Sequence, residues 1–165
     1  MYRSVCYINF MKLKLLLPIL FIVYSCSQDA SIDRKDLIEK AGAPLLNGLG
    51  SHSFTISSKV EGVQEYFDQG LIMAFAFNHA ESIRSFKAAQ KLDPNCAICF
   101  WGEALALGPN INVTSDGKAI MSPQDRLDAF ERTNKAISLI EFASPKEKDF
   151  ILTLKSRYNG DVNSS

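Results

Sequence analysis

Apolar residues recur along most of this chain at the spacing of amphipathic helices. In the last such stretch, Phe150, Leu154 and Tyr158 follow one another at steps of four residues, which places them on one helix face. The run 71–77 is apolar almost all round, as in a helix that is buried on several sides. The pattern predicts an all-α fold with helices at about 60–77, 80–91, 96–107, 123–140 and 145–158.

Capping signals stand at the expected starts of these helices. Two Ser-Pro pairs begin with Ser122 and Ser144, and a proline is favoured in the first helical turn after such a cap. Three capping-box patterns occur: Ser58 with Glu61, Asn78 with Glu81, and Ser144 with Glu147.

The helices between residues 60 and 107 carry the spacing of a tetratricopeptide repeat, a helix–turn–helix unit of about 34 residues. Its signature positions are held by Tyr66, Gly70, Phe86, Ala89 and Pro94, and 34 residues after the first two stand Phe100 and Ala104. Gln69, Met73 and Ser82 depart from the usual residues. The repetition predicts a stack of antiparallel helix pairs, a TPR-like solenoid of about five helices.

Each signature position has a steric role in such a stack. Gly70 or Ala104 lets a second helix cross closely, and Phe86 fills the wedge between the helices. Pro94 ends the second helix. Because no repeat precedes residue 60, we expect the segment 45–59 to cap the outer face of the first helix and to pack on it.

The second repeat is longer than the first. Ala129 and Ala136 lie 47 residues after Ser82 and Ala89, so the turn between its helices has gained about 13 residues, which we place at 108–121. Long loops in compact domains are often functional. Asn110 and Asn112 in this insertion are therefore candidate ligand-binding residues, although asparagine after Gly-Pro is also ordinary loop chemistry.

The N-terminus has the pattern of an export signal. From Met11, a second possible start, Lys12 and Lys14 precede an apolar run at 15–24, which is too short to span a bilayer as a helix. It ends at Val-Tyr-Ser-Cys26, which resembles a bacterial lipobox, whose cysteine is lipidated and becomes the mature N-terminus. A plain secreted protein and an uncleaved anchor are the alternatives.

The whole chain then divides into five parts. These are a signal peptide (1–25), a flexible tether (26–44) with a short helix at 33–41, a capping segment (45–59), the helical domain (60–158) and a disordered tail (159–165).

The stretches 66–71, 77–81, 92–94 and 101–110 are similar to a group of bacterial exported tetratricopeptide proteins. The resemblance covers about residues 50–158 and implies an α-helical repeat scaffold, without an established activity. Members of that group continue well beyond the point that matches Tyr158. The resemblance therefore implies a truncated member.

Charge argues against a nucleic-acid partner. The chain has 18 basic and 18 acidic residues, but Arg3, Lys12 and Lys14 precede Cys26, so cleavage there leaves 15 basic residues against 18 acidic ones. A net charge of about −3 offers no general attraction for phosphate backbones.

Cys96 and Cys99 form a CxxC pair where the third of these helices begins, with Asn95 as the expected cap. Three interpretations stay open: buried thiols or a structural disulfide, a redox-active pair favoured by the helix N-terminus, and a metal site. His52 and His79 are the only histidines. His79, at the first interhelical turn, is either a packing residue or a candidate ligand-binding group.

No phosphate loop, zinc-protease motif or nucleophile elbow occurs, and we assign no catalytic residue, metal or cofactor. The sequence favours an interaction scaffold in the bacterial cell envelope, anchored to a membrane by lipid on Cys26, that binds a protein or peptide in its concave groove. The alternative is a thiol redox or metal-binding module built on Cys96 and Cys99.

Overall fold

A computed structural model describes residues 33–109 and 121–158, which belong to one compact unit that begins at Ile32. The signal peptide, Cys26, Asn110, Asn112 and the tail at 159–165 lie outside the described residues, as does most of the insertion. Within the described ranges every regular element is a helix, which confirms the all-α prediction. The elements are α2 (Arg34–Ala41), α3 (Val63–Phe75), α4 (His79–Leu92), α5 (Ala97–Leu107), α6 (Pro123–Ser138), the 3₁₀ turn η1 (Ile140–Phe142) and α7 (Pro145–Lys155).

Local capping explains most of the helix boundaries. Asn78, Ser122 and Ser144 accept a hydrogen bond from the backbone N–H three residues later, at the starts of α4, α6 and α7. Helix α3 differs from the prediction because it begins after Gly62, not after Ser58. The Ser58 hydroxyl instead donates to Asp93 at 2.6 Å, so this serine serves a contact with the end of α4.

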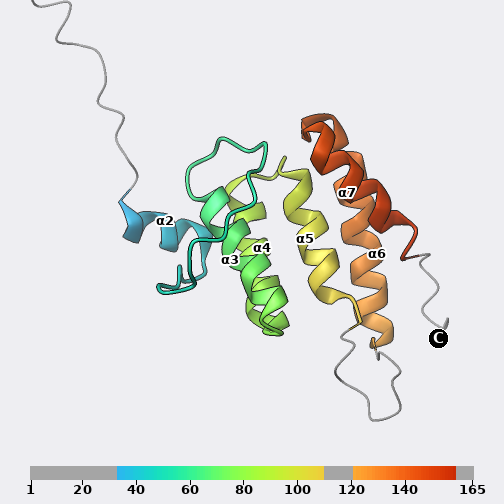
Figure 1. Ribbon diagram of the computed structural model, residues 1–165, viewed down its shortest axis with the longest axis horizontal. Coiled ribbons are helices and arrows are strands. Elements are labelled where there is room, and N and C mark those ends of the chain that lie inside the picture. The colour runs from blue at the N-terminus through green and yellow to red at the C-terminus, as the bar shows by residue number, and fades with distance from the viewer. Residues whose placement is uncertain (1–32, 110–120, 159–165) are drawn as a thin grey trace, which may run out of the picture. The chain divides into compact units, whose positions relative to one another are not determined.

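Successive helices pack side by side, as Figure 1 shows from α3 to α7. Each of α3, α4, α5 and α6 contacts the helix that follows it, and α5 also contacts α3 and α7. The connection between α3 and α4 is only three residues long, which makes these two helices an antiparallel hairpin. The short helix α2 lies against α4.

The core between α3, α4 and α5 is built around Phe86 of α4. Its buried ring lies between Gly70 of α3 and Gly102 of α5. A Cβ added at Gly70 would stand 2.9 Å from the ring, and one added at Gly102 only 2.3 Å. Ser82 donates a 2.7 Å hydrogen bond to the Gly70 carbonyl, which explains why a small polar residue is accommodated at this buried position.

The short helix predicted at 33–41, within the expected tether over 26–44, is present as α2, and this part of the chain packs on the core. Helix α2 ends at Gly42, whose φ of 76° suits a residue without a side chain. Leu37, Ala41 and Ala43 are buried in the main core, and the Tyr66 hydroxyl of α3 donates to the Ala43 carbonyl. Residues from α2 onward are therefore part of the helical domain, because their apolar side chains are buried in the core beside α4.

None of the described helices has the length and apolar character needed to cross a membrane.

Candidate functional site

A loop segment before α3, residues 53–57, contacts both α3 and α7 and is held largely by side chains that bind its backbone. We call it the crossing segment. The Phe54 N–H donates to Asp68 of α3 at 2.9 Å, and the Ile56 N–H donates to Gln64 of the same helix at 3.1 Å. The Gln64 amide also donates to the Phe54 carbonyl at 2.9 Å. One glutamine thus satisfies two backbone groups of the segment.

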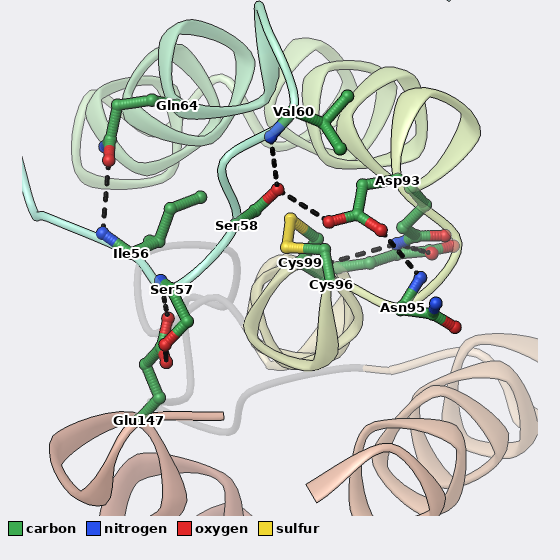
Figure 2. Close-up of a disulfide and its surroundings, with 12 residues drawn as sticks. Ile56, Ser57, Ser58, Val60, Gln64, Asp93, Asn95, Cys96, Cys99 and Glu147 are labelled. Carbon is green, nitrogen blue, oxygen red and sulfur yellow. Dashed lines mark hydrogen bonds between the residues drawn. A yellow bond between two sulfur atoms is a disulfide. The ribbon is translucent and has the colours of Figure 1, made fainter. Parts of the chain in front are cut away.

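The far end of the crossing segment is bound by Glu147 of α7. This carboxylate is almost fully buried and accepts hydrogen bonds from the Ser57 N–H at 2.8 Å and from the Ser57 hydroxyl. It also accepts from the Ser144 N–H at 2.6 Å, which completes the capping box of α7. Figure 2 shows Ser57 directed at the Glu147 carboxylate and the backbone N–H of Ile56 directed at the Gln64 side chain. Buried charge is tolerated here because several donors surround it.

A row of aromatic rings runs beside this segment. Phe54 packs against Phe67 of α3 and against Phe150 of α7, with ring centroids 5.9 and 5.5 Å apart. Phe150 in turn packs against Trp101 of α5, with their ring centroids 5.5 Å apart. The Lys146 ammonium lies 4.0 Å from the Phe54 ring centroid, within cation–π range. Three helices and the crossing segment therefore share one aromatic surface.

The aromatic row continues into an open hollow of about 460 Å³ between α5 and α7. Trp101, Phe150 and Leu154 supply apolar surface, while Asp149 and Arg157 supply opposite charges at its edge. Apolar walls with a few polar groups are typical of ligand sites.

The structure joins Cys96 and Cys99 in a disulfide at the start of α5. Cys96, not Asn95, is the residue that precedes the helix, and it makes no side-chain capping bond. Cys96 and Cys99 are only 4% and 0% exposed. Cys96 lines one hollow together with Ser58 and Asp93. The hydrogen bond between Ser58 and Asp93, drawn in Figure 2, joins the residue after the crossing segment to the residue after α4.

The hollow beside Cys96 has a volume of about 240 Å³ and is also lined by Ser57 and Phe142. Space for a small reactant therefore exists next to the pair, although little of either cysteine reaches solvent.

Neither histidine lies next to the Cys96–Cys99 disulfide. His79 begins α4, and its Nδ1 lies 3.1 Å from the carbonyl oxygen of Ala106, near the end of α5 opposite to the disulfide. Its Nε2 is buried and has no hydrogen-bond partner among the described residues. His52 is exposed on the approach to the crossing segment. Among the described residues no group of three potential metal ligands occurs.

The residues of the proposed repeat signature lie in the interior of the helix stack, except Pro94, which is exposed. Tyr66, Phe86, Ala89 and Ala104 are fully buried, and Phe100 is 7% exposed. Gly70 lies against the Phe86 ring, and Pro94 follows the end of α4. They build the scaffold. The contacts of the crossing segment and the open hollow are formed by other residues: Gln64, Asp68, Trp101 and Phe150, with the buried Glu147.

Sequence reasoning did not identify that surface. No motif or spacing in the sequence singled out Gln64 or Asp68, and the spacing of Phe150 indicated only an apolar helix face. Glu147 carried a capping signal, but nothing local pointed to Ser57, which is 90 residues away.

Burial raises the pKa of both described tyrosines. For Tyr66 the burial outweighs the opposing effect of Arg34, while Glu65 adds to the rise. For Tyr158 burial outweighs the opposing effect of Arg157. The Tyr158 hydroxyl donates to the Ala104 carbonyl at 2.9 Å and so ties the end of α7 to α5.

Comparison of the chain with models of protein families, with curated proteins and with solved structures gave no match. The class that the described residues define is accordingly the broad one: an all-helical protein whose neighbouring helices carry a shared aromatic surface.

Proposed function

We propose that this protein is an interaction scaffold of the tetratricopeptide type that binds a peptide or a protein segment on its aromatic surface. The order of helix contacts supports this assignment, since each helix packs on the next and α5 also packs on α3 and α7. The repeated large and small positions of the sequence agree with it.

The observation that carries the proposal is the open hollow at Trp101 and Phe150. It continues the aromatic row beyond Phe54, so an extended ligand can place an apolar side chain there while its backbone follows the helices. Aromatic side chains provide a large contact area at low conformational cost, which is why they dominate many binding surfaces.

Trp101 is the only tryptophan of the chain, so its fluorescence reports directly on the hollow. Titration with a panel of extended peptides that carry one aromatic or large aliphatic residue should change this emission saturably. Phe150→Ala should weaken the binding about tenfold or more, since it removes one wall of the hollow. Leu152→Ala is the matched control, because Leu152 is exposed on the same helix and does not line the hollow. Equal effects of the two substitutions, or no saturable change, would refute this site.

We further propose that the scaffold is exported and held at a bacterial membrane through a lipid on Cys26. The basic and apolar pattern before that residue supports this location, and more than one acyl chain gives stable anchoring. Cys26→Ser should move the protein from the membrane fraction to the soluble fraction, with Cys6→Ser as the control. If both variants stay with the membrane, this anchoring is wrong.

A thiol redox function on Cys96 and Cys99 is the second candidate. The position of the pair at the start of α5 favours it, because helix N-termini stabilise thiolates. The burial of both sulfur-bearing residues favours a structural disulfide. Reaction of the folded protein with a dithiol reductant separates the two: rapid, reversible reduction supports redox chemistry, and reduction only on unfolding excludes it.

A further inference from the structure

We propose that the crossing segment occupies, within its own chain, a binding site for an extended peptide of the pattern aromatic, any residue, aliphatic, Ser or Thr. The inference rests on the proposed binding function and concerns the part of the aromatic row that Phe54 now occupies, next to the hollow at Trp101 and Phe150. In the structure the four positions are Phe54, Thr55, Ile56 and Ser57.

The contacts to the backbone make the site general for an extended chain. Gln64 binds the Phe54 carbonyl and the Ile56 N–H, and Asp68 binds the Phe54 N–H. These bonds are made to groups that every peptide carries. A second chain in the same conformation would satisfy Gln64 and Asp68 equally well.

The side chains of the segment define the pattern. Phe54 enters the aromatic row between Phe67 and Phe150, whereas Thr55 points to solvent and Ile56 is 3% exposed. This alternation is that of an extended chain, whose successive side chains point to opposite sides. The hydroxyl preference follows from Glu147, which accepts from both the N–H and the hydroxyl of Ser57.

The chain that leads into the segment has few contacts of its own. Residues 50–52 are exposed, and Gly48 and Gly50 have φ values of 80° and 87° with nothing near their missing side chains. The Ser53 hydroxyl, at the start of the segment, donates to Asp68 at 2.7 Å. Helix α5 contacts both α3 and α7 directly, so these three helices are held together by contacts that do not involve the crossing segment. An attached segment competes at a high effective concentration, so a free peptide should bind the wild-type protein weakly.

The test uses the full chain and a labelled synthetic peptide with the sequence of residues 51–58. Phe54→Ala weakens the attached segment, so the variant should bind the peptide about tenfold or more tightly than the wild-type protein does. Adding Gln64→Ala to that variant should remove most of the gain, because the two backbone contacts are lost. The control peptide carries Ala at the Phe54 position. The inference is overturned if the folded Phe54→Ala variant binds the peptide no more tightly than the wild-type protein does. It is also overturned if the added Gln64→Ala substitution leaves that binding unchanged.

A measurement on the unmodified protein covers the case in which Phe54→Ala impairs folding. Excess unlabelled peptide, added to the ¹⁵N-labelled chain, should accelerate hydrogen exchange at the amides of Phe54, Ile56 and Ser57 and leave those of α3 protected. Unchanged exchange at these three amides overturns the inference. If exchange is unchanged but other peptides still change Trp101 emission, the proposed binding function stands and only the inference about the crossing segment fails. If no peptide changes that emission, the proposed function and the inference both fail.

Discussion

Two glycines of the core, Gly70 and Gly102, lie directly against the ring of Phe86. Sequence spacing pointed to Gly70 and Ala104 as the small residues at the crossing points. In the structure the tightest approach is at Gly102, where the Phe86 ring occupies the space that a side chain would need. The ring cannot move aside easily because Phe86 is fully buried.

Gly102→Ala should therefore destabilise the protein by about 1–3 kcal/mol through overpacking. A gain of about 1 kcal/mol in helix propensity reduces the loss without cancelling it. Gly70→Ala is the matched comparison, since its added methyl would stand 2.9 Å from the same ring instead of 2.3 Å, and it should cost less. Urea unfolding of the three proteins checks the order. A Gly102→Ala protein as stable as wild type would contradict this account of the crossing.

At the scale of elements, α7 is both capped and attached through one carboxylate. Glu147 completes the capping box with Ser144 and binds Ser57 of the crossing segment. The start of the helix and the position of a segment 90 residues away therefore depend on the same charged group.

Glu147→Gln should lower the free energy of unfolding by about 1.5–3 kcal/mol, because hydrogen bonds to a charged acceptor are lost and an amide N–H₂ meets other donors. Asp149→Asn is the control, since Asp149 is exposed on the same helix. Urea unfolding gives the energies, and hydrogen exchange at the Ser57 amide shows whether the segment is released. Equal stability of the two variants would show that the buried contacts of Glu147 contribute little.

At the scale of the whole described unit, two buried tyrosine hydroxyls join distant parts. Tyr66 binds the carbonyl of Ala43 and so holds the end of α2 to α3, and Tyr158 binds the carbonyl of Ala104. Burial raises the pKa of both phenols above their usual value of about 10. The folded state thus keeps these protons at a pH at which the unfolded chain has lost them.

Stability should therefore fall as pH rises above about 10, since the unfolded state then binds fewer protons than the folded one. The stabilisation that comes from the two neutral phenols is fully present below about pH 10. It is lost as the pH rises through the raised pKa values of the folded state. Thermal unfolding between pH 8 and 11 measures this, and Tyr158→Phe should flatten the alkaline slope. Slopes are compared, not absolute stabilities, because the substitution also removes a hydrogen bond. An unchanged slope would mean that Tyr158 does not contribute to the alkaline loss.

The helices of this protein could be predicted from the sequence because their signals are local. Apolar spacing and the caps at Asn78, Ser122 and Ser144 lie within a turn or two of the positions that they determine. The expected ranges for α4, α5 and α6 differ from the structure by no more than two residues at either end. The lipobox pattern and the insertion at Asn110 and Asn112 stay predictions, because they fall outside the described residues.

Tertiary structure alone decided where the chain between α2 and α3 lies. Ser58 looked like a cap for α3, but its hydroxyl binds Asp93, 35 residues away. No sequence pattern singled out Gln64 or Asp68, yet they bind the crossing segment. Such polar contacts follow no periodicity, since each depends on two groups that only folding brings together. The sequence by itself therefore determined an all-helical chain and most of its helix starts, because those signals are local. Packing determined which polar and aromatic side chains lie together around the crossing segment.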